Sequence, residues 1–314
     1  MSADADMDKI KGTGMGVVLV HGSVETSCER PFLEVLEDAA RRGYGALGAG
    51  VLDAVERAVN HLEDSPLFNA GTGSVLNRDC EIEMDAAIIH GLTNRFGAVA
   101  AITGVGHPIS VARKVLEETD HVFLAGGGAT RFAREKGFPE ASCVTEGQYR
   151  SWQKAKEILS SGGQLEFSAY TGIDIAGSDT VGCVVWSPEG ELAAGSSTGG
   201  SFLKLPGRVG DTPMLGGGIY ASKACAVVCT GRGEAFIETL MAKYIDELVT
   251  FGLDPQRAAE AAILRLYELK GATGGVLVVD RQGRIGAAHN TGSFPVAVAV
   301  GGMVRPVEPV RVAT

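Results

Sequence analysis

Two hairpin patterns have strands that are apolar on both faces, and they constrain the fold more than any other feature of the sequence. In residues 180–186 (TVGCVVW) neither alternating set of side chains is polar, and after the turn SPEG the run 191–198 completes a hairpin. Residues 276–288 repeat the pattern around the turn RQG. Strands without a polar side must be covered above and below. We therefore predict an α/β fold with two stacked, mainly antiparallel sheets between helix layers, a four-layer αββα sandwich.

The remaining segments supply further strands and the outer helices. Short apolar runs predict strands at residues 16–20, 82–89, 98–102 and 122–124. Sequence patterns typical of helices recur in five segments: 49–63, 108–118, 152–159, 234–250 and 255–269. The polar tract at about 138–179 predicts a flexible tail before a core strand. We expect a single domain over residues 1–314.

Composition excludes several classes of function. A formal net charge of -10 offers no attraction to nucleic acid or to an anionic membrane. Apolar runs fall far short of the about 20 residues that span a bilayer, and the acidic start lacks the features of a signal peptide, so we expect a cytoplasmic protein. The six cysteines form no C-x-x-C pair and the six histidines no close pair. This predicts reduced core thiols and no transition-metal site.

Glycine is unusually frequent, with 44 residues in 314. This frequency predicts many tight turns and close backbone approaches. The two triple-glycine runs, 126–128 and 216–218, do not support a nucleotide site. The first lacks the third glycine of G-x-G-x-x-G, and no phosphate-binding Lys-Ser/Thr follows the second. We interpret both as turns or close packing.

The motifs that bear on chemistry follow one another between residues 179 and 234. They are DTVG (179–182), SSTGG (196–200), KLPGRVGD (204–211) and CTGRGE (229–234). With them the sequence resembles the plant-type (type III) L-asparaginase and isoaspartyl peptidase family of threonine N-terminal nucleophile (Ntn) hydrolases. Further similar segments extend the resemblance to nearly the whole chain: 62–76, 83–88, 97–117 and 271–280. The resemblance implies the Ntn-hydrolase form of the αββα sandwich.

The resemblance also implies that Thr180 is a nucleophile. A threonine hydroxyl attacks poorly unless a base takes its proton, and an N-terminal threonine supplies an α-amine with a pKa of about 7.7 to 8. The chain would therefore cut itself between Asp179 and Thr180, through attack on the Asp179 carbonyl, a nitrogen-to-oxygen acyl shift and ester hydrolysis. The products would be an α subunit, 1–179, and a β subunit, 180–314. The alternative is an ordinary strand threonine.

Arg208 and Asp211 match the family's substrate-binding residues. A guanidinium can bind an α-carboxylate through two parallel hydrogen bonds, and a carboxylate can pair with an α-ammonium group. Together they would recognise an amino-acid head group, with Gly233 lining the same pocket. The alternative is a mutual surface salt bridge, which would contribute little to stability.

Four more residues receive roles from the resemblance. Thr198 would lie beside the nucleophile and hold the new ammonium group. Thr230 and Gly231 would offer a hydroxyl and a backbone N–H to the charge that develops on the attacked carbonyl. Asn69, in NAGTG, would support autoprocessing and the geometry of the site, or else only satisfy its own loop.

The resemblance implies no cofactor other than a structural sodium ion held by backbone carbonyls. These carbonyls belong to one loop: Leu62, Glu63, Ser65, Phe68, Ala70 and Thr72. It also implies a small-molecule substrate, asparagine or a β-aspartyl peptide, and a homodimer of αβ units, which is a heterotetramer of chains.

The sequence departs from the family pattern at HGSVET (21–26), where the family has HGGAG. Ser23 replaces a glycine, and Val24 and Glu25 add bulk and charge, which leaves the rate of precursor cleavage and the shape of the pocket open. Arg232 adds a cation near the pocket that would favour a substrate with a distal carboxylate.

Other functions stay open beside hydrolysis of L-asparagine and β-aspartyl dipeptides. Glycosylasparaginases share Asp-Thr at the cut, although their strand usually ends STNG where this chain has STGG at 197–200. A taspase-like protease would need protein substrates and lacks that signature. From another class, an uncleaved pseudoenzyme would keep the fold and bind an amino acid without turnover.

Overall fold

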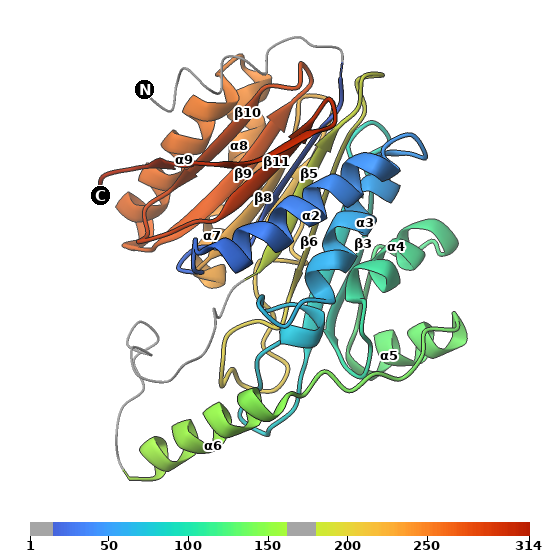
Figure 1. Ribbon diagram of the computed structural model, residues 1–314, viewed down its shortest axis with the longest axis vertical. Coiled ribbons are helices and arrows are strands. Elements are labelled where there is room, and N and C mark those ends of the chain that lie inside the picture. The colour runs from blue at the N-terminus through green and yellow to red at the C-terminus, as the bar shows by residue number, and fades with distance from the viewer. Residues whose placement is uncertain (1–14, 162–179) are drawn as a thin grey trace.

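The computed structural model describes residues 15–161 and 180–314, and within these ranges two β-sheets stack between layers of helices (Figure 1). The spatial order of the eight-stranded sheet is β12 (Met303–Val307), β11 (Val296–Val300), β1 (Val17–His21), β5 (Val181–Trp186), β6 (Leu192–Thr198), β2 (Met84–His90), β3 (Arg95–Ile102) and β4 (Phe123–Ala125). The order of the five-stranded sheet is β13 (Val310–Arg311), β10 (Ile285–His289), β9 (Gly274–Asp280), β8 (Cys225–Gly231) and β7 (Ile219–Ala221). Neighbouring strands are antiparallel except in the pairs β3–β4 and β10–β13. This arrangement confirms the predicted αββα sandwich.

The predicted hairpins lie in the centre of the sandwich and are buried on both faces. In β5, Val181 and Cys183 pack against the helices outside the larger sheet, whereas Val184 packs between the two sheets. Every residue of β5, β6 and β9 is buried. Because burial of a large aliphatic side chain contributes about 1.5–3 kcal/mol, these strands supply much of the force that joins the layers.

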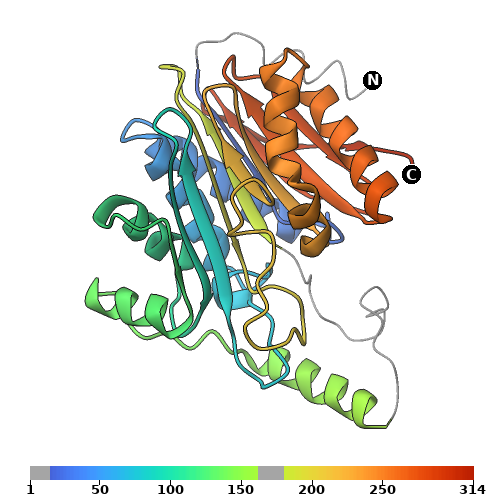
Figure 2. The ribbon, with the colours of Figure 1, turned by 180° about the vertical axis from the view of Figure 1, so that it is seen from behind.

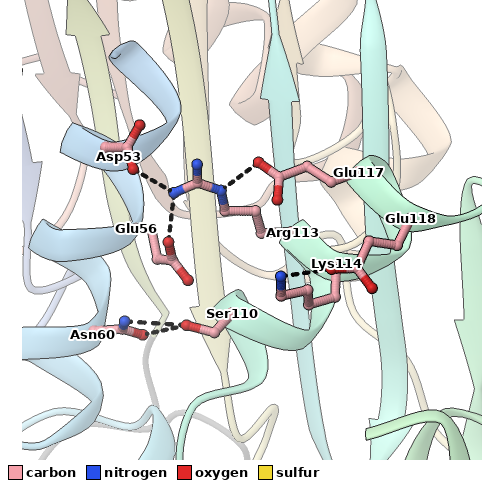
Figure 3. A network of polar contacts seen from close by, with 8 residues as sticks. All are labelled: Asp53, Glu56, Asn60, Ser110, Arg113, Lys114, Glu117 and Glu118. Atoms are coloured by element: carbon pink, nitrogen blue, oxygen red, sulfur yellow. Dashed lines mark hydrogen bonds and ion pairs between the residues drawn. The ribbon is translucent and has the colours of Figure 1, made fainter. Parts of the chain in front are cut away.

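Helices α2 (Arg30–Ala46), α3 (Val51–Glu63) and α4 (Pro108–Glu118) cover the outer face of the larger sheet (Figure 1). Gly43 lets α2 approach α3 closely, since a Cβ there would lie 2.9 Å from the Ala54 carbonyl oxygen. Figure 3 shows that Arg113 of α4 reaches Asp53 and Glu56 of α3, at 3.0 and 2.6 Å. This outer layer is therefore held by apolar packing and by a polar network at its surface.

Helices α7 (Gly233–Thr239), α8 (Met241–Thr250) and α9 (Pro255–Lys270) pack on the smaller sheet. Figure 2 shows α8 and α9 on its outer face. The side chain of Asp254 accepts a hydrogen bond from the Gln256 N–H at 3.0 Å and caps α9, and Gly271 ends that helix in a left-handed conformation. Both ends of α9 lie within one residue of the predicted bounds, 255–269.

Several elements differ from the sequence-based expectation. Helix α2 was not predicted, although Pro31 lies in its first turn. The single helix expected at 234–250 is two helices, because Leu240 adopts a left-handed conformation between α7 and α8. The triple glycine at 126–128 is not a turn but the first turn of α5 (Gly126–Glu135).

The tract expected to be a flexible tail from about residue 138 includes helix α6 (Glu146–Ser160), which begins before the predicted helix at 152. Trp152 donates a hydrogen bond to the Asn77 carbonyl at 2.9 Å, and Ala155 packs in a small core with Phe202 and Leu203. The first part of this tract is therefore attached to the domain. The rest of the predicted tail, from residue 162 on, lies outside the described residues.

Two further observations concern the composition. Among the described residues, no helix is long and apolar enough to cross a membrane. All six cysteines lie within the described ranges and are free thiols, four of them buried.

Candidate active site

Three of the predicted threonines lie at one end of the sandwich and face the space between the sheets. Thr180 precedes β5, Thr198 ends β6, and Thr230 lies near the end of β8. Alternate residues of a strand point to the same face. Even-numbered residues of these strands pack in the core between the sheets, among them Val184, Ala194 and Val228. The antiparallel strands thus bring together side chains that are far apart in the sequence.

Thr180 is buried beside a second hydroxyl that sequence reasoning missed. The residue is 7% exposed, and its Oγ1 lies 3.3 Å from Oγ1 of Thr212. Thr212 directly follows Asp211, so the loop that carries the predicted head-group acid adjoins the predicted nucleophile. Asp179, the other residue of the predicted cut, lies outside the described residues.

Thr198 lies opposite Thr180 when the register of β5 and β6 is continued by one residue. Its Oγ1 accepts a hydrogen bond from the Gly200 N–H at 2.9 Å. Asn69 fastens the same turn, since its Nδ2 donates to the Gly200 carbonyl at 2.6 Å and its own carbonyl accepts from the Gly199 N–H at 3.0 Å. A Cβ at Gly199 would lie 2.3 Å from Asn69 Oδ1, so only glycine fits here. Asn69 therefore shapes the end of β6 and does more than satisfy its own loop.

The predicted head-group residues lie together, but Arg208 does not pair with Asp211. Its Nε and Nη2 donate to the two carboxylate oxygens of Glu234, at 3.0 and 3.1 Å. A Cβ at Gly233 would lie 2.9 Å from Asp211 Oδ1 and 3.1 Å from Arg208 Nη2. Gly233 thus lies between the cation and the buried acid, where any side chain would crowd both.

The charge of Asp211 is poorly compensated in the free protein. Its Oδ2 is buried and has no hydrogen-bond partner among the described residues. Burial raises the pKa of this carboxyl to about 7, and a hydrogen bond from its own backbone N–H and the charge of Arg208 lower it only in part. Burial alone would raise the pKa of Glu234 as well, but Arg208 outweighs that effect and lowers it. An α-ammonium group would supply the charge that Asp211 lacks.

The predicted oxyanion pair lies at the end of β8. Thr230 is fully buried, and its hydroxyl contacts the Ser23 hydroxyl from the loop after β1. Gly231 has φ of 132° and packs against β9, where a Cβ would lie 2.6 Å from the Gly274 Cα. A hydroxyl and a glycine backbone position with positive φ therefore lie side by side, next to the end that carries Thr180.

The loop expected to hold sodium is tightly coiled. A Cβ at Gly71 would lie 2.4 Å from the Glu63 carbonyl oxygen, and one at Gly73 would lie 1.9 Å from that of Phe68. Carbonyl oxygens are hard ligands that suit such an ion, and no group of three acidic, histidine or cysteine side chains within residues 15–161 and 180–314 could hold a metal instead. The coiled loop fits the implied carbonyl ring, which stays a prediction.

The sequence as a whole matches a known family. A model of the family described as asparaginase matches residues 14–306. The chain belongs to the asparaginase family. This confirms the resemblance found from the motifs, and the two sheets and their helices are consistent with the Ntn-hydrolase sandwich.

Relatives of this asparaginase-family chain cover almost its full length. It is 45% identical over 303 residues to the plant-type L-asparaginase of Pyrococcus abyssi, covering 93% of this chain and 99% of that protein. It is 38% identical over 284 residues to the isoaspartyl peptidase/L-asparaginase of Xenopus laevis, covering 88% and 89% of the two chains. The isoaspartyl peptidase of Escherichia coli is 36% identical over 298 residues, with 88% and 91% covered. The chain is therefore a hydrolase of this amide-hydrolysing family, which acts on small molecules.

Two residues of this asparaginase-family site were missed although their motifs were noticed. Glu234 ends the CTGRGE motif, and a role for it as partner of Arg208 could have been suggested by its charge alone. Asp85, in EMDAAI, is buried and accepts hydrogen bonds from the Ala101 and Gly210 N–H groups at 2.8 and 3.4 Å. It thereby anchors the Arg208–Asp211 loop to β2, a long-range contact that no local pattern indicates.

Proposed function

We propose that this chain cuts itself before Thr180 and then hydrolyses L-asparagine, β-aspartyl dipeptides or both through an acyl ester on Thr180. The observation that carries the proposal is the adjacency of two features. The loop with Arg208 and Asp211 contacts the predicted nucleophile through Thr212, at 3.3 Å. A substrate held by its head group would present an amide only a few bonds away, as the side chain of asparagine does.

The first reaction would mature the protein. Thr180 Oγ1 attacks the carbonyl carbon of Asp179, the bond from that carbon to the Thr180 nitrogen breaks, and an ester forms in its place. Water then cleaves the ester, which releases the Asp179 carboxylate and leaves Thr180 with a free hydroxyl and a free α-amine. That amine has a pKa near neutrality and can serve as the base for turnover.

The second reaction would use the same atoms on a bound substrate. The α-carboxylate binds Arg208 and the α-ammonium group binds Asp211. The Thr180 α-amine takes the hydroxyl proton while Oγ1 attacks the side-chain carbonyl, and Thr230 and the Gly231 N–H stabilise the oxyanion. The leaving nitrogen takes a proton and departs as ammonia or as the amine of the second residue. Water then hydrolyses the ester to aspartate.

Thr180→Ala tests the proposal directly. The wild-type protein should resolve into two fragments on a denaturing gel, whereas Thr180→Ala should remain full length and release no ammonia from L-asparagine. Thr180→Ser is the matched control, because it keeps the hydroxyl and should keep slower cleavage. A wild-type chain that stays intact after long incubation would support the pseudoenzyme alternative instead.

A side-by-side assay separates the substrates within the class. L-Asparagine, β-aspartyl-leucine and a glycosylasparagine would be compared at equal concentration with the mature enzyme. The proposal requires hydrolysis of at least one of the first two, and a preference for the third would favour glycosylasparaginase activity. A homodimer of αβ units and the sodium ion stay predictions from the resemblance.

A further inference from the structure

Ser23, where the sequence departs from the family pattern, contacts the predicted oxyanion threonine. The Ser23 hydroxyl forms a hydrogen bond with Thr230 Oγ1, and both residues are 0% exposed. Ser23 follows β1 of the larger sheet and Thr230 belongs to β8 of the smaller one. The bond therefore joins the two sheets at the end that holds the site.

Ser23 has a strained backbone conformation, which a hydrogen bond to His21 helps to hold. Its φ is 80°, in the left-handed region that favours glycine. The Ser23 N–H donates to Nδ1 of His21 at 3.1 Å, and burial lowers the pKa of His21 to about 3, so the ring is neutral. Strain of this kind persists where surrounding contacts hold it, and it gathers at functional sites. Glycine would relieve the strain but would lose the hydroxyl.

We propose that Ser23 is a positioning residue that donates its hydroxyl hydrogen to Thr230, so that Thr230 can donate its own to the oxyanion. A hydroxyl has one hydrogen to donate and two lone pairs that accept. Neither hydroxyl has another hydrogen-bond partner among the described residues. If Thr230 donated its hydrogen to Ser23, it would have none left to donate to the oxyanion. With Ser23 as donor, the Thr230 hydroxyl is fixed and polarised toward the substrate.

This inference rests on the proposed function, because it concerns the same site. Ser23→Ala removes the hydroxyl and keeps the Cβ, whereas Ser23→Gly removes both and relieves the backbone. Each should lower kcat for L-asparagine about 5-fold, the effect of one hydrogen bond, with KM within twofold of wild type. We extend the proposal to the oxyanion that forms on the Asp179 carbonyl during precursor cleavage, so cleavage, followed on a denaturing gel, should slow by a similar factor.

Two comparisons separate positioning from a structural role. Ser110→Ala is the matched control: it removes the hydroxyl of a buried serine that bonds Asn60 at 3.1 Å in the outer layer, and it should leave kcat unchanged. In a Thr230→Val background, Ser23→Ala should cause no further loss, because the group that it positions is gone. A purely structural role would instead lower kcat equally in both backgrounds, and would let Ser23→Gly restore it.

The outcomes are distinguishable from failure of the proposed function. A wild-type protein that hydrolyses neither L-asparagine nor β-aspartyl-leucine would overturn the proposed function and this inference together. An active wild-type protein whose Ser23→Ala and Ser23→Gly variants match it in kcat and in cleavage rate would overturn only the role of Ser23.

Discussion

Asp211 bears an electrostatic cost in the free protein that its proposed ligand would remove. Burial raises the pKa of the carboxyl from 3.8 to about 7. Between these values the folded state holds a proton that the unfolded state has released. Stability from this residue is therefore greatest below about pH 4 and falls as the pH rises toward 7. Above about pH 7 the folded protein therefore carries a buried carboxylate without a cationic partner, as expected of a group that binds the ammonium group of a substrate.

Asp211→Asn should therefore stabilise the protein while it weakens substrate binding. At pH 8, in the uncleaved Thr180→Ala background, we expect the free energy of unfolding to rise by about 2–4 kcal/mol. At pH 4 the gain should vanish, because Asp211 is then protonated in the folded state. Urea unfolding at both pH values measures this, and KM of the cleaved single variant should rise at least about 100-fold with loss of the ion pair.

Asp246→Asn is the matched control for this prediction. Asp246 is equally buried, but Lys243 Nζ lies 2.7 Å away and the Ser222 hydroxyl also bonds it. Removal of a paired charge should lower stability at pH 8 rather than raise it. If both variants were destabilised alike, the carboxylate of Asp211 would have a partner in solution and the argument from its burial would be lost.

Between helices, the contact of α3 with α4 offers a prediction that is independent of catalysis. Arg113 donates to Asp53, Glu56 and Glu117, and its side chain is 16% exposed (Figure 3). Arg113→Met should lower the free energy of unfolding by about 1–2 kcal/mol, because three carboxylates would lose their shared cation. Activity should not change, since this surface lies outside the site.

Lys114→Met supplies the control for Arg113→Met. Among the residues that the structure describes, Lys114 forms an ion pair with Glu118 of the same helix alone, at 2.6 Å, and both side chains are more than a third exposed. Such i,i+4 pairs contribute about 0.3–0.5 kcal/mol, so the variant should be close to wild type in thermal unfolding. Equal losses in the two variants would mean that the network in Figure 3 adds nothing beyond ordinary surface pairs.

How well elements were predicted from sequence depended on whether their cause is local. The hairpins and α9 were found because alternation, a cap and a turn lie within a few residues. Helix α2 was not predicted, although Pro31 in its first turn is a local signal of a helix start. The break at Leu240 could not be found, because no glycine marks it: the left-handed residue is imposed by the packing of α7 and α8 on the sheet.

The residues of the candidate site likewise fall into those that local motifs indicate and those that only the fold brings together. Thr180, Thr198 and Thr230 were proposed through their motifs, and strand parity explains why they meet. The pairing of Arg208 with Glu234 depends on a contact across 26 positions, and the anchoring of its loop by Asp85 spans 125. The charge of Glu234 suggests a partner for Arg208, but the contact itself, like that of Asp85, is visible only when the fold is known. The role proposed for Ser23 rests on two observations: its departure from the family pattern in the sequence, and its contact with Thr230 in the structure.

In the whole molecule, the proposed cut does not divide the fold into two bodies. Strand β1 comes from residues before the cut, and it hydrogen-bonds β11 and β5, which come after it. Strand β6, after the cut, pairs with β2, from before it. The larger sheet therefore interleaves strands of both subunits, and the αβ unit shares one core.

The two fragments of the cleaved protein should consequently stay associated under native conditions. Once unfolded and separated, they should refold poorly. In size exclusion without denaturant, fragments 1–179 and 180–314 should elute together, and a denaturing gel of that peak should show both. After full unfolding in urea and dilution, the cleaved form must bring two chains together, whereas uncleaved Thr180→Ala keeps them tethered at high effective concentration. The refolding yield of the cleaved form should therefore fall as the protein is diluted, whereas the yield of Thr180→Ala should fall far less. Elution of the two fragments in separate native peaks, or equal yields for both forms at every concentration, would contradict an interleaved core.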